Sequence, residues 1–210
     1  MSIETISEIA AVWLDSSLES PEAASNRREW WYTGGAAVDD DIRARFGDLI
    51  PKACAGKLMA WQSTPDGALA LIVLLDQFTR SIYRNTPRAY AGDACAYDVV
   101  TRAIEQNLDS ALPTVSRIWL YHPFHHAEDV EDQDKGLALL DKLREEAPAE
   151  WHPYVERSIE GWARHRNIVA RFGRFPHRNA VLGRDSTEEE YDFLKANDET
   201  YGQGPKPTTA

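Results

Sequence analysis

Residues 64–84 read TPDGALALIVLLDQFTRSIYR and contain the longest apolar run of the chain. Pro65 directly after Thr64 is typical of a helix start, because proline fits the first turn of a helix. Every residue from Ala68 to Leu75 is apolar. A helix without a polar face must be enclosed by other elements. The stretch therefore predicts a domain of helices packed around a central one.

Helical periodicity covers most of the remaining chain, and no stretch alternates with period two. Further helices are predicted over 6–14, 37–55, 89–107, 113–121, 123–146 and 153–172, with a last one after the capping box at 186–189. Residues 15–36 are predicted as a loop. Short connections favour antiparallel neighbours, in a bundle or in stacked hairpins. The fold class is all-α, with about eight helices in one domain over 1–202 and a disordered tail over 203–210.

Composition excludes several classes of function. The chain has 34 acidic and 23 basic residues, a net charge of -11, which argues against nucleic acid and anionic membranes as partners. The longest apolar run, 68–75, is far shorter than the roughly 20 residues of a membrane span. Cys54 and Cys95 have no CxxC partner and are expected as free thiols. With no export signal at the N-terminus, these features predict a cytoplasmic protein.

Polar groups interrupt the apolar face of the central helix. Asp76 lies on the stripe that carries Leu69 and Ile72, and Arg80 and Tyr83 follow one and two turns later. Because a lone buried carboxylate is costly, Asp76 is expected to pair with Arg80 at i,i+4. The pair would either fix helix packing or belong to a site.

The predicted helix over 123–146 shows the same change. Its apolar stripe, followed toward the N-terminus, meets Asp132, Asp129, Glu128 and His125. A solvated face, or acids placed favourably at a helix N-terminus, would also explain these residues.

The helix over 153–172 places His165 at the centre of an apolar face, with the small residues Ser158 and Gly161 beside it. Such a histidine is often a satisfied core residue. Three helices with polar groups on their inward faces nevertheless favour a shared polar pocket, because buried polar groups need partners.

Residues 164–184 contain six arginines, two histidines and no acid. The turn that holds Arg174, His177 and Arg178 is a candidate for binding a carboxylate or phosphate, since guanidinium groups bind both in bidentate fashion. It would equally suit pairing with the acids of 123–146.

A divalent metal is a lesser possibility, through His125, Asp129 and Asp132 at helical spacing. No HExxH motif occurs, and Pro123 is expected to break any continuous helix from His122. No P-loop, GxSxG or GxGxxG motif is present, so no cofactor is predicted.

Three segments resemble the signatures of a bacterial family, the domain of unknown function 924 family. They are LDQFTRSIYR at 75–84, HHAEDVEDQ at 125–133 and HRNIVARFGRFPHRNAVLGR at 165–184. The resemblance covers the chain to about residue 202 and implies a helical fold similar to tetratricopeptide repeats, with no established reaction. Thr79 and His126 stand where the family usually has proline and serine.

We therefore predict a small-molecule enzyme that acts on an anionic substrate by acid–base chemistry: hydrolysis, elimination or isomerisation. The candidate catalytic residues are Asp76, His125, Asp129, Asp132 and His165, and the candidate anion-binding residues are Arg80, Tyr83, Arg84, Glu128, Arg174, His177 and Arg178. The alternatives are a non-catalytic helical module that binds a peptide or small anion, and a structural network in a homodimer.

Overall fold

A computed structural model describes residues 3–196 of the chain, and the predicted tail over 203–210 lies outside this range. The α-helices are α1 (Ile3–Leu14), α2 (Pro21–Thr33), α3 (Gly35–Phe46), α4 (Ile50–Cys54), α5 (Pro65–Ile72), α6 (Thr79–Ile82), α7 (Asp93–Glu105), α8 (Thr114–His126), α9 (Val130–Glu146), α10 (His152–Phe172), α11 (Asn179–Leu182) and α12 (Glu188–Ala196). Short 3-10 helices are η1 (Asp15–Leu18), η2 (Met59–Ser63), η4 (Pro87–Tyr90), η5 (Asp109–Ala111), η6 (Ala149–Trp151) and η7 (Pro176–Arg178), and η3 (Val73–Phe78) is a π-helix. No strand occurs over 3–196, which confirms the all-α class.

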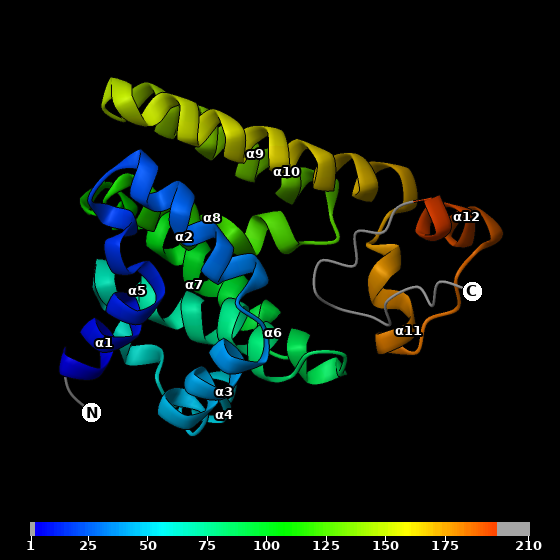
Figure 1. The fold of residues 1–210 in the computed structure, drawn as a ribbon, viewed down its shortest axis with the longest axis horizontal. Coiled ribbons are helices and arrows are strands. Elements are labelled where there is room, and N and C mark those ends of the chain that lie inside the picture. The colour runs from blue at the N-terminus through cyan, green and yellow to red at the C-terminus, as the bar shows by residue number, and fades with distance from the viewer. Residues whose placement is uncertain (1–2, 197–210) are drawn as a thin grey trace.

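The central helix is confirmed. Helices α5, η3 and α6 follow one another without a break, and every residue over 67–79 is buried. Thr64 caps α5 by accepting a hydrogen bond from the Gly67 amide at 3.2 Å. Helices α1, α7 and α8 contact α5, and Figure 1 labels all four in the body of the molecule away from α11 and α12. Burial on all sides explains why this segment can be apolar all round.

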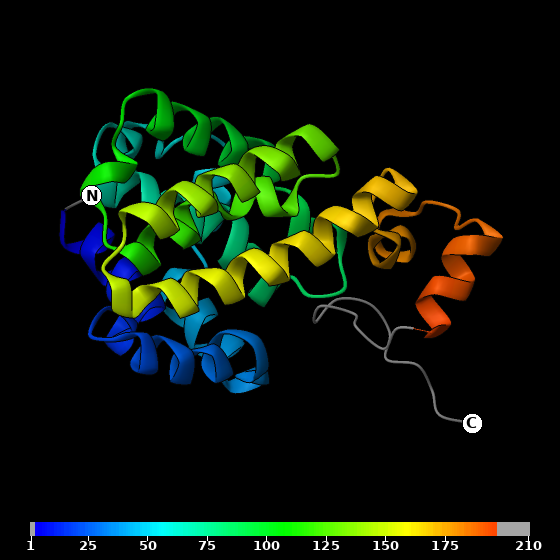
Figure 2. The same cartoon turned by 90° about the horizontal axis from the view of Figure 1, so that it is seen from above.

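Helices α9 and α10 form an antiparallel hairpin beside α8, joined by the short connection over 147–151. Figure 2 shows α10 extending past the N-terminal end of α9 toward α11 and α12. A Cβ atom on Gly136 would lie 3.0 Å from the Phe124 Cβ and 3.1 Å from the Trp162 ring, so this glycine permits close packing. Over the described residues, no helix is both long and apolar enough to cross a membrane.

The predicted loop over 15–36 is wrong, because residues 21–33 form α2. Ser20 accepts a hydrogen bond from the Ala23 amide at 3.1 Å, and Pro21 occupies the first turn. This is a regular helix start that the sequence already contains. The predicted helix over 37–55 is divided into α3 and α4 near Gly47. Because of these changes, residues 3–196 contain more helical segments than the eight or so that were predicted.

Pro123 does not begin a helix, contrary to the prediction. It lies inside α8, and α9 starts only at Val130, capped by the Asp129 side chain. A proline inside a helix removes one backbone hydrogen bond but does not always end the helix. The consequence is large: His125 belongs to the last turn of α8, on the same helix as His122 and not on the stripe of α9.

The predicted capping box occurs one residue later than expected. Thr187 Oγ1 accepts a hydrogen bond from the Glu190 amide at 3.2 Å, and Glu190 Oε2 accepts one from the Thr187 amide at 2.8 Å. This reciprocal pair starts α12.

Candidate functional site

The larger cavity, of about 690 Å³, lies between the central helix and α2, α8 and α10. Its volume is within the range of small-molecule sites. The polar and charged lining residues are Arg28, Gln77, Arg80, Ser81, Arg84, His122, His125, His126, Arg157, Ser158, Glu160, Arg164 and His165. The main aromatic lining residues are Trp13, Trp31, Tyr32, Trp119, Tyr154 and Trp162. Four histidines and five arginines thus line one cavity, and Glu160 supplies the single carboxylate among these lining residues.

The π-helix η3 places a further carboxylate, that of Asp76, directly behind the cavity lining. Asp76 is fully buried, and its carboxylate accepts hydrogen bonds from Gln77 Nε2 and from His126 Nδ1, at 2.8 Å and 2.9 Å for His126. Arg80 Nη1 lies 2.9 Å from Asp76 Oδ1, which confirms the i,i+4 pair. Single π-helical turns occur often at functional sites because they displace side chains from regular spacing.

A second acid holds Arg80 from the other side. Its guanidinium donates to both carboxylate oxygens of Asp93, at 2.9 Å and 3.0 Å. A Cβ atom on Gly92 would overlap the Leu75 carbonyl oxygen, so only glycine lets the start of α7 approach η3 this closely. The close approach brings Asp93 to Arg80.

The last two turns of α8 supply three of the four cavity histidines. The His122 ring stacks on Trp119 with centroids 4.1 Å apart, and His122 Nδ1 lies 2.9 Å from the Ile118 carbonyl. The His125 ring stacks between Trp162, at 4.7 Å, and His165, at 4.0 Å with planes 1° apart. The His125 ring is 5.2 Å from that of His126. Within the described part of the chain, His125 Nδ1 is buried without a hydrogen-bond partner.

All four histidines are held in the neutral form at neutral pH. Burial lowers the pKa of His122 to about 4 and that of His165 to about 3. Burial, and then the neighbouring His165, holds the pKa of His125 well below its usual range. For His126, burial and then Arg80 lower the pKa well below its usual value. Neutral imidazoles are proton acceptors, which is the form that a general base requires.

Three of the lining arginines, Arg28, Arg157 and Arg164, are here called the cavity arginines. Over residues 3–196, none of them has a carboxylate within 4.0 Å. Arg84, in contrast, donates to Asp39 at 2.6 Å and 3.0 Å. A positive cavity in a chain of net charge -11 favours an anionic ligand.

The structure brings together only part of the predicted site. Asp76, Arg80, Arg84, His125 and His165 lie in or directly behind the cavity lining. Asp129 and Asp132 lie at the start of α9, outside the cavity lining: Asp129 is exposed and caps the helix, and Asp132 accepts a hydrogen bond from the Tyr97 hydroxyl at 2.6 Å. The inward stripe predicted for them is wrong, because α9 begins after His125.

The remaining predicted residues lie outside the cavity lining. Tyr83 packs against Arg88, whose guanidinium carbon is 3.9 Å from the ring centroid. Arg174 donates to Glu190 at 2.7 Å and 2.8 Å, and Glu128 accepts hydrogen bonds from Arg184 and from the Phe175 amide.

Arg178 and His177 lie behind the histidines. Arg178 is buried, and its Nη2 donates to the His126 carbonyl at 3.0 Å; its Nη1 is 3.7 Å from Asp93. Burial, and then Arg178, holds the pKa of His177 well below its usual range. The C-terminal turn thus supports the backbone of His126.

The suggested metal ligands do not converge. His125 faces α10, whereas Asp129 and Asp132 lie at the start of α9. Over 3–196, no three His, Cys, Asp or Glu side chains are placed to hold a metal ion. The residues present do not fit the metal site that their spacing suggested.

His122, His126 and Arg28 also line the cavity and were not among the predicted site residues. The three histidines within residues 122–126 were the available signal. They could be placed on one helix only if α8 was assumed to continue through Pro123. Arg28 lies on α2, which was predicted as loop.

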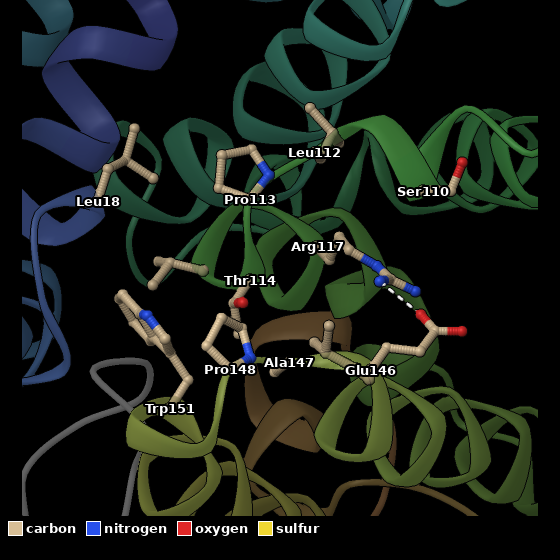
Figure 3. Close-up of a pocket in the computed structure, with 12 residues that line it drawn as sticks. Leu18, Ser110, Leu112, Pro113, Thr114, Arg117, Glu146, Ala147, Pro148 and Trp151 are labelled. Carbon is tan, nitrogen blue, oxygen red and sulfur yellow. Dashed lines mark ion pairs between the residues drawn. The ribbon is translucent and has the colours of Figure 1, made fainter.

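A smaller cavity, of about 380 Å³, lies between the start of α8 and the connection from α9 to α10 (Figure 3). Its charged lining residues neutralise each other. Arg117 Nη1 pairs with Glu146 at 2.7 Å, and its Nη2 is 3.7 Å from Asp109. This cavity contains no histidine and no unpaired arginine among its lining residues, so the larger cavity is the candidate site.

The structure is that of an all-α protein with a cavity lined by histidines and arginines. The chain belongs to the DUF924 family, bacterial proteins of unknown function, whose model matches residues 9–198. A solved structure, a protein of unknown function ATU0120 from Agrobacterium tumefaciens, is 32% identical with a TM-score of 0.74. The match covers 92% of this chain and 98% of that one. Among curated proteins, none matches the chain.

Proposed function

We propose that this protein is a small-molecule enzyme that binds an anionic substrate in the larger cavity and moves a proton with His126. The observation that carries the proposal is the pair formed by His126 and the fully buried Asp76. It follows the logic of a catalytic dyad, in which a buried carboxylate fixes the tautomer and orientation of an imidazole.

The geometry assigns the proton positions on the ring. Because the Asp76 carboxylate only accepts, His126 Nδ1 is the donor, and Nε2 is left as the proton acceptor. Gln77 and Arg80 bind the same carboxylate and fix its position beside His126. His126 lines the cavity, so Nε2 is available to a substrate bound there.

The arginine charge around His126 would couple the binding of an anion to proton transfer. Burial, and then Arg80, lowers the pKa of His126. A bound anion would offset the arginine charge and raise this pKa toward the working range of a general base. Proton transfer of this kind supports hydrolysis, elimination or isomerisation, as the sequence predicted. His125 and His165 are the next candidates for a second proton carrier.

The test begins with a thermal-shift screen of small carboxylates and phosphates, followed by turnover assays of those that stabilise the protein. Loss of a general base typically lowers kcat by 10²–10⁴-fold, so we expect about this loss in His126→Gln and a smaller one in Asp76→Asn. The matched control is His152→Gln, because His152 bonds the Ala147 carbonyl outside the cavity lining.

Two results would contradict the proposal. If no anion stabilises the protein, the proposed binding function is wrong. Binding without turnover in the wild type would instead favour a non-catalytic anion-binding module, which the same cavity would serve.

The location and assembly are also proposals. Cys54 and Cys95 are free thiols, which suits the reducing cytoplasm of a bacterium. Cell fractionation checks the compartment, and light scattering on the purified protein tests the possible homodimer.

A further inference from the structure

We infer that the substrate of the larger cavity carries at least two hydroxyl groups beside its anionic group, an inference that rests on the proposed function and narrows it. The observation behind it is a set of hydrogen-bond acceptors on residues of the cavity lining: His122 Nε2, His126 Nε2 and Gln77 Oε1. An anionic group also only accepts hydrogen bonds, so it can satisfy the arginines but not these three atoms. They require a ligand group of another kind.

The protein fixes both imidazoles in the tautomer that accepts through Nε2. His122 Nδ1 lies 2.9 Å from the Ile118 carbonyl, which can only accept, so Nδ1 carries the proton. His126 Nδ1 donates to the Asp76 carboxylate for the same reason. Burial lowers the pKa of His122 to about 4, so this ring is neutral near pH 7. Both rings therefore present an acceptor at Nε2.

Gln77 provides the third acceptor. Its Nε2 donates to the Asp76 carboxylate, which leaves the amide oxygen Oε1 to accept. Over residues 3–196, no protein donor forms a hydrogen bond with Gln77 Oε1 or with Nε2 of His122 or His126. The acceptor capacity of these three side chains is thus directed to whatever the cavity binds.

The charge of the cavity selects the kind of donor. A ligand that enters displaces water from these acceptors and must offer donors in return, because a buried acceptor without a donor costs free energy. A protonated amine fits poorly, because five arginines and a single carboxylate, that of Glu160, line the cavity. A hydroxyl group fits well, since it is uncharged, donates to an imidazole and accepts from a guanidinium.

The spacing of the two imidazoles allows one small molecule to bond both. His122 and His126 lie one turn apart on α8, and their ring centroids are 5.6 Å apart. Residues four apart project from the same face of a helix. One hydroxyl would donate to His126, the proposed base, and a second would donate to His122. His122 thus binds the substrate and selects for the second hydroxyl.

Calorimetric titration with two matched pairs of anions tests this inference. D-gluconate and hexanoate are six-carbon carboxylates, whereas glycerol 1-phosphate and propyl phosphate are three-carbon phosphate monoesters. Only the first member of each pair carries alcohol groups. Wild-type protein should bind the hydroxylated member of at least one pair about tenfold more tightly, the effect of two additional hydrogen bonds. The pair with the larger ratio shows whether the anionic group is a carboxylate or a phosphate.

Substitution of His122 tests the residue itself. His122→Phe retains a flat ring beside Trp119 but removes the acceptor, so it should weaken the hydroxylated anion about fivefold and its alkyl partner by less than about twofold. His122→Gln should restore most of the affinity, because its amide oxygen can accept in place of Nε2. The matched control is His152→Phe, since His152 bonds the Ala147 carbonyl outside the cavity lining.

Circular dichroism establishes that each variant is folded. If His122→Phe does not fold, His122→Asn replaces it, because asparagine retains a donor for the Ile118 carbonyl and lacks the acceptor at Nε2. Equal losses for both members of a pair would contradict the inference, since a general defect of the cavity weakens both alike.

The outcomes separate this inference from the proposed function. Equal or tighter binding of the alkyl member in both pairs would overturn the inference and leave the anion cavity intact. Binding of none of the four anions would also overturn it, and the screen of other carboxylates and phosphates would then decide the proposed function.

Discussion

The C-terminal turn over 174–184 and the cavity arginines differ in what neutralises their charge. In the turn, Arg174 pairs with the buried Glu190, and Arg184 pairs with Glu128. Over residues 3–196, none of the cavity arginines has a carboxylate within 4.0 Å. The sequence pointed to the turn because it contains no acid of its own. The comparison shows that charge along a sequence does not reveal unpaired charge in space, since the partners come from distant segments.

The largest expected effect is that of low pH, which should destabilise the histidines of the cavity and leave the ion pairs of the turn unchanged. The cavity histidines have pKa values below 6.5 when folded, so the unfolded chain binds more protons and stability falls as pH drops below 6.5. The loss is up to about 1.4 kcal/mol per histidine for each pH unit. The turn keeps its charge there, because hydrogen bonds from Arg174 lower the pKa of Glu190 to about 2.

Thermal unfolding between pH 7 and pH 5 measures this effect, and the window lies above the titration of ordinary carboxylates. His165→Gln should show a shallower decline than the wild type, whereas His152→Gln should match it. A wild-type Tm that does not change across this range would mean that the histidines are not held neutral.

Arg184→Ala should destabilise the protein by about 2 kcal/mol, since it removes charge-assisted hydrogen bonds to Glu128. Affinity for a cavity anion should change by less than about twofold, because Arg184 is outside the cavity lining. Urea unfolding and calorimetric titration measure the two quantities. If Arg184→Ala lost anion affinity but not stability, the turn would bind the anion and would not be the stabilising region.

Arg28→Gln should do the opposite. We expect anion affinity to fall about tenfold, the effect of losing one charge-assisted contact, with Tm unchanged. Arg102→Gln is the control, because it removes the same charge from an exposed position on α7. If both variants weakened binding equally, the effect would be one of overall charge.

The smallest expected effect is the uptake of protons when an anion binds. Anion binding should raise the lowered pKa values of the cavity histidines, so a fraction of a proton should be taken up near pH 6. Affinity should therefore increase as pH falls from 7 to 6. Titration in two buffers of different ionisation enthalpy measures the uptake, and identical binding enthalpies would exclude it.

Prediction of the fold succeeded where the signals are local. The apolar run over 68–75 and the cap at Thr64 depend on neighbours within one or two turns, and the capping box of α12 lies only one residue later than predicted. It failed at α2, where the Ser20–Pro21 start was present but its helix has a weak apolar face. It also failed at Pro123, because tertiary packing maintains α8 through a residue that disfavours a helix interior.

Part of the site was predictable for the same reason. The Asp76–Arg80 pair is an i,i+4 contact within one helix, and His165 was identified from the face of α10. Asp132 was misplaced because a shift in a helix start changes which residues face inward. His126 could not be assigned a role, since its partner is 50 residues away.

Periodicity in the sequence is enough to show that this chain is helical and that one helix lies at its centre. The cost of burying an unpaired charge shows that Asp76 needs a cation. The histidine that meets Asp76 and the arginines that have no carboxylate within 4.0 Å could be found only in the folded protein. Both depend on how α2, α8 and α10 pack around the central helix, and that packing is set by the whole core.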